Sequence, residues 1–540
     1  MANAGILYVT MQPKPSLSLD QFHEWYNNEH GPTRLRIPSI FSNGLRYSAA
    51  AGTDASQPQY MAVYDVVSMQ SLETDTYTCL RANRSAREAE TISQVDVKRY
   101  FYDLMHTKQS PLFAPIEQLS DDEAVGITTV AVEMSLKDVP GGFEEYQSWY
   151  KEEHVEMLAK VPGWLRSRLF QTSSVEHPGQ TVLFMLHDYT KENGLGGPEH
   201  KASMDTPRRE KVFSTYVGKK GRSTWELFYT FGAAPRELAA LGRLPNSAAF
   251  ESADKKTSTT PGQDAAITSY IETADNLVIP FRLEGNASPN APTIAFCNSL
   301  LTSYSMWDPL VAIIKSQRPD VRILRYDTRG RNSIPQPHKA ATLVTVTSDL
   351  VQVLDTLRIQ KLDILIGVSM GGATTLNFAL SHPDRLSKFI AADFNCTSSP
   401  ANTQAWKDRI EVARNDNGAG IQVLAEQTVT RWFYPQTVQE KPEVAQWMTH
   451  MVATNDVEGF AHSCTALWDY DLKPLLQSCK IPGLLVVGDQ DAGGALVKAM
   501  QGFRSSIGPS GADIKIVENT GHLPMCEDPG AFWAAIASFL

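Results

Sequence analysis

The chain has 540 residues, more than one hydrophobic core usually serves, because cores stop growing at roughly 250–300 residues. Hydrophobic residues make up 42% and charged residues 20%, a composition that excludes a fibrous or mainly disordered protein. The net charge of −11 argues against a nucleic-acid partner, since such proteins concentrate basic residues. We therefore expect several folded domains and a small-molecule substrate.

The sequence lacks the patterns of membrane spans, targeting peptides and cofactor sites. No apolar run reaches about 18 residues, and the N-terminus has no basic segment followed by a long apolar one. The six cysteines form neither a C-x-x-C pair nor a metal-binding cluster, and we find no phosphate loop or dinucleotide fingerprint. We expect a cytoplasmic protein without a membrane partner, metal ion or cofactor.

A repeat occupies the first 232 residues. Residues 22–30 read FHEWYNNEH, and residues 145–154 read EYQSWYKEEH. The aromatic residues fall at helical spacing in both copies, which predicts amphipathic helices that pack on a sheet. Each copy, 1–118 and 119–232, is predicted to be an α+β unit. The expected strands are 6–11, 61–66 and 98–105 in the first copy, and 126–134, 182–188 and 224–231 in the second.

The run from Trp25 to Pro32, with Glu-His near the helix end, resembles the EthD-like members of the dimeric α+β barrel family. The resemblance covers residues 4–232 and implies a tandem ferredoxin-like domain, folded as a fused pseudo-dimer. Such a tandem closes the barrel within one chain, or its remaining sheet faces pair two chains as a homodimer.

Two histidines are candidates for a second site in this half. His30 and His154 each lie four residues after a tyrosine, on the face of the apolar stripe. The EthD-like resemblance implies acid–base chemistry on a polyketide-like ring, in a lyase or cyclase reaction. The alternative is that both are helix-end histidines bonded to backbone carbonyls, in a barrel that serves assembly or substrate delivery.

Residues 233–266 are rich in Ala, Ser, Thr, Pro and Lys without an apolar period, which predicts a linker. Residues 267–283 then predict a hairpin. Strands alternating with helical stretches predict a mostly parallel, doubly wound sheet over 267–540, with a helical cap at about 396–478. The six expected strands are 293–297, 321–326, 362–367, 389–392, 484–487 and 514–517.

A G-x-S-x-G pattern, centred on Ser369, lies between an apolar strand and a helix-forming run. This is the context that the nucleophile elbow of an α/β-hydrolase requires. The glycines leave room for a sharp turn that lifts the Ser369 hydroxyl above the sheet, and the N–H of Met370 faces a developing oxyanion. We predict a second oxyanion donor in the loop after strand 293–297, the N–H of Leu300, with Asn298 and Ser299 shaping the turn.

A serine nucleophile needs a base and an acid, which follow it in chain order in this fold. His522, in the loop after the last strand, is the predicted base, because His450 and His462 fall in presumed cap helices. Asp491 is the predicted acid, since the turn after Gly488 usually points the residue three places on toward the histidine. Asp489 is then expected to stabilise the turn.

The C-terminal half also resembles the β-ketoadipate enol-lactone hydrolases, over almost all of residues 267–540. The family implies a small acidic lactone as substrate, with Ser299, Arg431 and Trp432 at the pocket; the last two can equally be a surface cation and a packed aromatic. The matching runs are NSL at 298–300, MWDP at 306–309, YDTRG at 326–330, WKDRI at 406–410, RWFYP at 431–435, ALWDYDL at 466–472 and GHLP at 521–524.

Departures from this family lie at Leu301, at residues 330–332 and at residues 493–495, and they predict a different substrate. The expected fold is an α/β-hydrolase with a helical cap, preceded by the α+β tandem barrel. The expected function is a serine hydrolase that opens a lactone or cleaves an ester through an acyl-enzyme, in specialised, polyketide-like or aromatic metabolism. The alternatives are C–C bond hydrolysis on the same triad, and cyclase or lyase chemistry on the barrel histidines.

Overall fold

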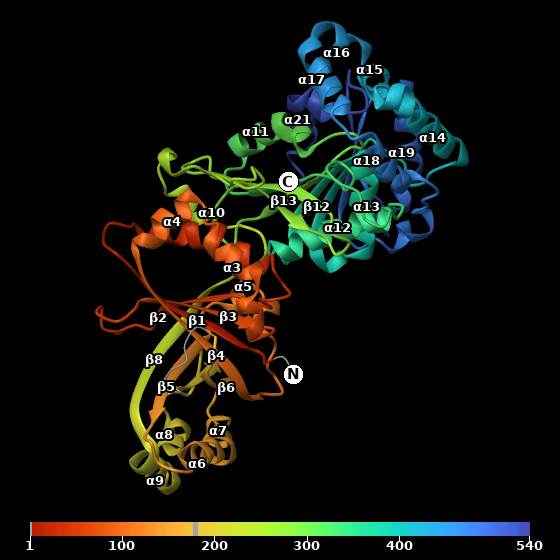
Figure 1. Ribbon diagram of the computed structural model, residues 1–540. Helices are drawn as coiled ribbons and strands as arrows, with labels where there is room; N and C mark the ends of the chain where they lie inside the picture. Colours follow the sequence, from red (N-terminus) through yellow and green to blue (C-terminus); the bar gives the residue numbers. More distant parts are fainter. Residues whose placement is uncertain (1–2, 176–181) are drawn as a thin grey trace. The chain divides into compact units, whose positions relative to one another are not determined.

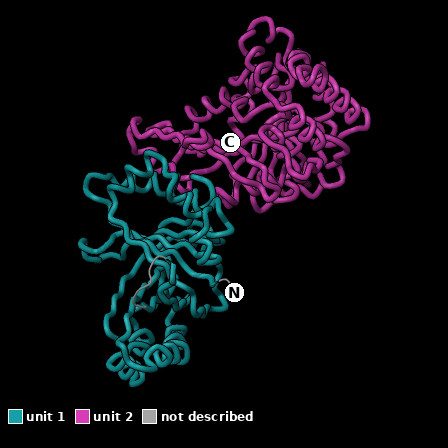
Figure 2. Tube along the Cα trace, viewed as in Figure 1, with its two compact units in different colours: residues 1–235 teal, residues 236–540 magenta. Residues whose placement is uncertain are grey.

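The computed structural model describes residues 3–175 and 182–540. Residues 1–2 of the first predicted repeat and 176–181 of the second therefore lie outside the described part. The chain divides into two compact units, residues 1–235 and 236–540 (Figure 2). No helix in the described ranges is long and apolar enough to cross a membrane.

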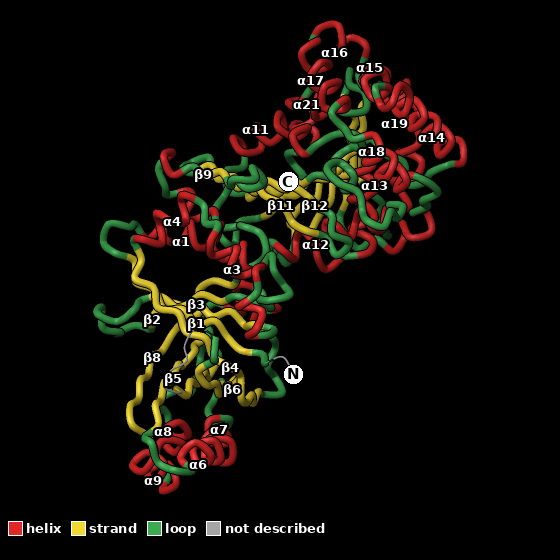
Figure 3. Tube along the Cα trace, in the orientation of Figure 1, coloured by secondary structure: helices red, strands yellow, loops and turns green. Residues whose placement is uncertain are grey.

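Unit 1 contains a closed barrel of eight antiparallel strands (Figures 1 and 3). Each repeat contributes four strands, ordered β4-β1-β3-β2 and β8-β5-β7-β6, and the repeats join where β2 pairs with β8 and β4 with β6. Each described barrel strand therefore has two neighbours, which leaves no open sheet edge. The strands are β1 Gly5–Pro13, β2 Leu45–Ala49, β3 Tyr60–Val66, β4 Val95–Gln109, β5 Thr128–Leu136, β6 Trp164–Thr172, β7 Val182–Tyr189 and β8 Val217–Thr230.

The second strand of each repeat, β2 and β6, was missing from the sequence prediction, which placed only a turn there. Arginines interrupt the apolar alternation in these strands, and the tertiary structure gives them partners on neighbouring elements. In β2 the buried Arg46 donates to the Asn27 amide oxygen at 2.8 Å. Arg166 and Arg168 contact Asp188 and Asp65 at 3.0 and 2.6 Å. From the sequence alone a charged residue is expected to be exposed, because its buried partner is not known.

The repeated aromatic motif forms a helix with a π-helical turn in both repeats. The turns cover Tyr26–His30 and Tyr150–His154, so tyrosine and histidine lie out of α-helical register. The stripe residues Phe22, Trp25 and Tyr146 are buried as predicted. The helices of this unit are α1 Leu19–Trp25, α2 Gly31–Leu35, α3 Asp75–Ala82, α4 Ala86–Ser93, α5 Asp121–Ala124, α6 Gly142–Trp149, α7 Val155–Leu158, α8 Pro198–Met204 and α9 Pro207–Tyr216.

Unit 2 is built on a ten-stranded sheet, ordered β18-β17-β16-β15-β13-β14-β12-β11-β10-β9. The strands from β18 to β14 pair in parallel, and those from β14 to β9 pair antiparallel. The antiparallel strands are β9 Phe250–Glu251, β10 Ser258–Thr260, β11 Ala266–Glu272 and β12 Val278–Gly285. The parallel strands are β13 Thr293–Cys297, β14 Arg322–Tyr326, β15 Leu362–Val368, β16 Leu386–Ala392, β17 Gly483–Gly488 and β18 Asp513–Val517.

The predicted linker, 233–266, is folded instead. It contains α10 Leu238–Gly242 and the strands β9 and β10, which extend the antiparallel edge of the sheet. Thr257 and Thr259 are buried, and the Thr257 hydroxyl lies 2.8 Å from that of Ser269 on β11, whereas the Thr259 hydroxyl has no hydrogen-bond partner among the described residues. Buried threonines add no apolar period to the sequence, so the sequence pattern concealed these strands.

Helices cover the sheet, and a cap is inserted between β16 and β17. Buried β15 and β13 side chains, such as Ile366 and Phe296, share one core with Leu310 of α11 and Ile536 of α21, and this core continues into the cap through Met448. The sheet helices are α11 Asp308–Gln317, α12 Leu343–Thr356, α13 Met370–Ser381, α19 Ala495–Phe503, α20 Pro524–Glu527 and α21 Pro529–Ile536. The cap helices are α14 Pro400–Arg414, α15 Gly420–Trp432, α16 Pro435–Glu440, α17 Pro442–Ala453 and α18 Val457–Cys464.

Two aspartates of α12 provide a matched test of how burial sets the value of an ion pair. Arg329 donates two 2.7 Å hydrogen bonds to the buried Asp349, whereas Asp355 pairs with Arg385 at the surface. Asp349→Ala removes two charge-assisted hydrogen bonds and leaves the partly exposed Asp275 as the remaining ion-pair partner of Arg329, so it is expected to lower the free energy of unfolding by about 2–3 kcal/mol. Asp355→Ala is expected to cost about 0–1 kcal/mol in the same urea titration. Equal losses would contradict this account.

Candidate active site

Ser369 lies in a strained turn between β15 and α13. Its backbone has φ 60° and ψ −121°, a conformation that costs on the order of 1–3 kcal/mol for a residue with a side chain. A Cβ atom on Gly371 would lie 2.0 Å from the carbonyl oxygen of Cys297, and one on Gly367 would lie 2.1 Å from the carbonyl oxygen of Gly371. Only glycine permits this packing, which brings the end of β13 against the elbow.

The structure brings the three predicted side chains together in one chain of hydrogen bonds. The His522 Nε2 atom lies 2.9 Å from the Ser369 hydroxyl, and its Nδ1 atom lies 2.7 Å from an Asp491 carboxylate oxygen. Because a carboxylate only accepts, Nδ1 carries the proton and Nε2 is left to accept from the serine. The His522 and Asp491 side chains are 15% and 8% exposed, so the arrangement is largely shielded from water.

The loop that carries His522 is held by the end of helix α15 and by Glu527. The backbone N–H of His522 donates to the carbonyl of Trp432 at 2.6 Å, and the Trp432 ring lies 5.6 Å from the imidazole. The Glu527 carboxylate accepts from the N–H groups of Gly521 and Tyr434 at 2.7 and 2.8 Å. The cap therefore fixes the position of the imidazole.

Asp489 lies in the turn before Asp491 and accepts hydrogen bonds there. One of its oxygens accepts from the N–H of Thr520 at 3.3 Å, and the other accepts from the side chain of Gln490 at 2.9 Å. These contacts agree with the predicted turn-stabilising role.

The loop predicted to supply the second oxyanion donor lies beside the elbow. A Cβ atom on Gly371 would also lie 2.7 Å from the carbonyl oxygen of Asn298, so the Leu300 segment begins directly against the start of α13. Met370 is the first residue of α13, where backbone N–H groups lack intrahelical partners. The buried Ser299 hydroxyl has no hydrogen-bond partner within the described part of the chain.

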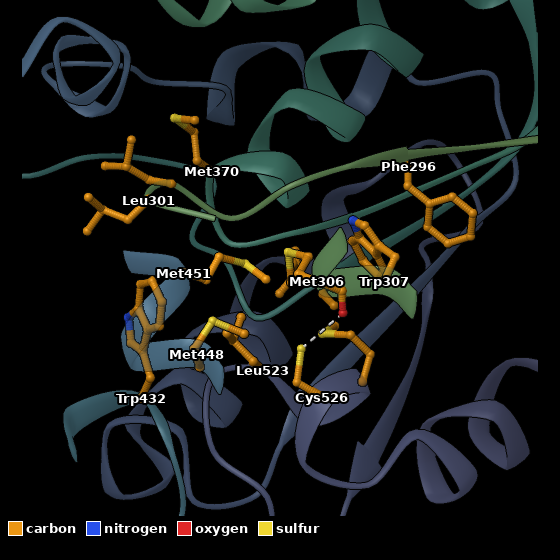
Figure 4. Packing of buried hydrophobic residues seen from close by; sticks show 14 of the residues in the cluster. Phe296, Leu301, Met306, Trp307, Met370, Trp432, Met448, Met451, Leu523 and Cys526 are labelled. Carbon is orange, nitrogen blue, oxygen red and sulfur yellow. Dashed lines mark hydrogen bonds between the residues drawn. The ribbon is translucent and has the colours of Figure 1, made fainter. Parts of the chain in front are cut away.

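Leu301, the first departure from the family pattern, has a strained backbone, and its carbonyl accepts two hydrogen bonds. Its φ is 71°, and its carbonyl accepts from Asn455 at 2.7 Å and from the second departure, Arg331, at 3.2 Å. Figure 4 shows Leu301 beside Met370 in the apolar cluster that also includes Trp432 and cap methionines. The two departures are therefore linked by a direct contact.

The remaining predicted residues lie in different environments. Trp432 is buried, whereas Arg431 is exposed, with its guanidinium 3.5 Å from the Thr428 hydroxyl. The structure does not bring His30 and His154 together, because each belongs to its own repeat of unit 1.

The two barrel histidines differ with respect to the helix-end alternative. Nδ1 of His30 lies 2.9 Å from the Glu88 carboxylate rather than bonding a backbone carbonyl. Nδ1 of His154 has no partner among the described residues, but His154 makes a hydrogen bond with the backbone of Ser203, as that alternative expects. Burial lowers the pKa of His30 to about 4 and that of His154 to about 3, so both imidazoles are neutral at pH 7.

Asp393 is a site residue that the sequence reasoning missed. It follows β16, is fully buried, and accepts from the N–H of Gly488 at 2.9 Å. Burial and the neighbouring charge of Asp491 raise the pKa of Asp393 well above its usual range. The available signal was an acid directly after a buried strand, the same pattern that singled out Asp489 and Asp491.

A parallel sheet with a serine elbow, and a histidine and an aspartate on later loops, defines the α/β class of hydrolases. The family described as "Alpha/beta hydrolase family" matches residues 294–535. 3-Oxoadipate enol-lactonase 2 of Acinetobacter baylyi is 32% identical over 219 residues, 41% of this chain and 78% of that protein. 3-Oxoadipate enol-lactonase 1 of the same organism is 33% identical over 206 residues, 38% of this chain and 74% of that protein.

This chain therefore belongs to the α/β-hydrolase family and is a hydrolase. Among solved structures, the enol-lactonase from Burkholderia xenovorans LB400 is 30% identical with a TM-score of 0.44, and the match covers 50% of this chain and 98% of that one.

Asp393→Asn is expected to remove a pH-dependent loss of stability. With its pKa raised on folding, Asp393 binds its proton more tightly in the folded chain, so the unfolding free energy falls as the pH rises above about 4 and levels off beyond the raised pKa. The amide does not titrate, yet its oxygen still accepts from Gly488. Urea midpoints from pH 4 to pH 9 should show the wild type losing stability relative to the variant. A constant difference would refute the assignment.

Proposed function

We propose that this protein is a serine hydrolase that opens a lactone or cleaves a carboxylic ester, with Ser369, His522 and Asp491 as its triad. The observation that carries the proposal is the hydrogen-bonded chain from the Ser369 hydroxyl through His522 to Asp491. As Ser369 attacks the carbonyl carbon, His522 accepts the hydroxyl proton and Asp491 stabilises the imidazolium. The N–H groups of Met370 and Leu300 stabilise the oxyanion.

The second half of the cycle uses the same groups. When the tetrahedral intermediate collapses, the imidazolium returns its proton to the departing oxygen and an acyl-enzyme remains on Ser369. In a lactone this oxygen stays attached to the acyl chain. Water, deprotonated by His522, then attacks the acyl-enzyme and releases the acid.

The substrate class rests on the relatives and on the groups around the triad. Both Acinetobacter relatives are named enol-lactonases, and this supports a lactone or enol ester. The unpartnered hydroxyl of Ser299 and the Trp432 ring beside His522 are proposed to contact the substrate, with Arg431 attracting an acidic group from the exposed side. The Leu301–Arg331 contact replaces the family pattern, so we propose a substrate other than that of the relatives, in specialised, polyketide-like or aromatic metabolism.

We also propose that unit 1 is a tandem EthD-like α+β barrel. The repeated motif supports this, as does the strand order, which is the same in both repeats and matches a ferredoxin-like unit. One chain supplies all eight strands, so barrel closure requires no second chain. Because the pKa values of His30 and His154 are lowered, neither is an imidazolium acid at neutral pH, and we assign the hydrolysis to unit 2.

Fluorophosphonate labelling tests the activated nucleophile. The wild type is expected to gain one adduct on Ser369, seen by intact mass and peptide mapping, because His522 makes the hydroxyl nucleophilic. Ser369→Ala removes the labelled atom and His522→Ala removes the base, so both should remain unlabelled. A folded wild type that forms no adduct would overturn the proposed mechanism.

The two aspartates after β17 form a matched pair for the acid. Asp491→Asn is expected to lower kcat for p-nitrophenyl butyrate by about 1,000-fold or more, because the amide favours the wrong imidazole tautomer. Asp489→Asn keeps an acceptor for the N–H of Thr520 and should change kcat only a few-fold. Similar losses in both variants would argue that Asp491 acts only through the fold of the turn.

A further inference from the structure

The second repeat of unit 1 encloses a cavity of about 240 Å³ between the motif helix and strands β5 and β7. This volume is somewhat below the roughly 300–1,000 Å³ of pockets for drug-sized ligands, so it suits a small ring system. Its walls are mainly apolar and aromatic, and methionines adapt readily to the shape of a ligand. The apolar wall residues include Val132, Met134, Trp149, Met185, Met204 and Phe213.

Four polar atoms on residues that line the cavity are buried without a hydrogen-bond partner in the described ranges. They are the hydroxyl of Tyr150, the indole nitrogen of Trp149, Nδ1 of His154 and Nε of Arg209. Each such group that is left unsatisfied lowers the free energy of unfolding by about 1–3 kcal/mol. A ligand that bonds to them would offset this cost.

The hydrogen bonds of two further lining histidines define which nitrogen of each carries the proton. The Ser167 hydroxyl accepts from the Trp164 indole at 2.9 Å, so its own proton is left for Nδ1 of His187, 2.8 Å away. The N–H of Gly196 donates to Nδ1 of His200 at 3.2 Å. Both imidazoles therefore carry their proton on Nε2 and are donors there.

The charged side chains around the cavity are all cationic. Arg209, Lys220 and Arg222 line it, and no Asp or Glu is among its described lining residues, although the whole chain carries a net charge of −11. The Arg209 guanidinium lies 4.2 Å from the centre of the Phe213 ring, and Lys220 and Arg222 are exposed. This local charge favours an anionic group on the ligand.

The first repeat satisfies two of the counterpart groups internally. There Tyr26, the counterpart of Tyr150, accepts a hydrogen bond from Tyr64 at 3.2 Å, and His30, the counterpart of His154, pairs with Glu88 at 2.9 Å. The indole nitrogen of Trp25, the counterpart of Trp149, is buried without a partner in the described ranges, as that of Trp149 is. The two repeats therefore differ at the tyrosine and the histidine of the motif.

The strands that face the motif helix also differ between the two repeats. Tyr64 lies directly before Asp65, and His187 lies directly before Asp188, so Tyr64 and His187 are counterparts. Two residues before them lie Ala62 and Met185, which are counterparts as well. Ala62 pairs with Arg46 and Met185 pairs with Leu169, so Arg46 and Leu169 occupy matching positions. Arg46 is fully buried, with its guanidinium 4.3 Å from the Tyr26 ring centre. A large cation thus packs against the motif helix of the first repeat, where the second repeat has a leucine.

We propose that the cavity of the second repeat binds a small planar aromatic carboxylate, with its ring against Trp149 and Met185 and its carboxylate toward Arg209 and Arg222. His187 and His200 are placed to donate to its oxygen substituents. The three cationic side chains that line the cavity favour an anionic ligand. This binding does not depend on the hydrolytic function proposed for unit 2.

Methyl NMR of the full chain, labelled with 13C at its methionine methyl groups, tests the location. The probe is 1-naphthoate, which has no ester bond, and its uncharged control is 1-naphthalenemethanol. We expect 1-naphthoate to shift the signals of Met134, Met185 and Met204, assigned from single Met→Leu variants, and the alcohol to bind about tenfold more weakly. Shifts confined to Met370, Met448 and Met451, or no binding at millimolar 1-naphthoate, would overturn the proposal.

Calorimetry on variants tests the cavity itself. Leu169→Arg with His187→Tyr gives the second repeat the residues that the first repeat has at these positions, and it should weaken 1-naphthoate binding by tenfold or more. Tyr64→Phe in the first repeat should leave the affinity within twofold.

Arg209→Gln tests the same cavity without altering the sheet, and loss of a charge-assisted hydrogen bond predicts about a tenfold loss of affinity. Unchanged affinity in Arg209→Gln and in the folded double variant would contradict the proposal. Labelling of Ser369 is a separate readout, so failure of either proposal leaves the other testable.

Discussion

The hydrolase unit depends on one close approach, that of the elbow backbone to the end of β13. Gly371 packs so tightly against the carbonyl of Cys297 that no larger residue fits, and the turn holds Ser369 at positive φ. This contact sets where the serine hydroxyl projects and where the Leu300 loop begins. The sheet core around Ile366 and Phe296 maintains the strained turn through its packing.

Buried carboxyl groups around His522 are arranged so that each has a defined task. Asp491 contacts the imidazole, Glu527 accepts two backbone N–H groups, and Asp393, whose pKa is raised, accepts from Gly488. Several ionised carboxylates in a shielded space would repel one another, and the raised pKa of Asp393 avoids part of that cost. The site therefore contains several neighbouring acids that affect one another, rather than an isolated triad.

The two barrel repeats show how one motif supports different outcomes. Both contain the same π-helical turn, yet Glu88, Tyr64 and Arg46 complete the first repeat with internal contacts, whereas the matching region of the second surrounds a cavity. Because both repeats lie in one chain, each half mutates independently, and this permits the divergence. In a homodimer of identical chains, both halves would change together.

The sequence alone determined the features that are local in the chain. The glycines around Ser369, the aromatic stripe at Phe22 and Trp25, and the apolar strands of the parallel sheet follow from sterics and periodicity. Tertiary structure decided what depends on partners distant in sequence: the strands with buried Arg46 and Arg168, the folded segment at 233–266 and the raised pKa of Asp393. The physical reason is that a charged or polar residue becomes a core residue only when a partner from another element satisfies it, and the sequence does not state which partner that is.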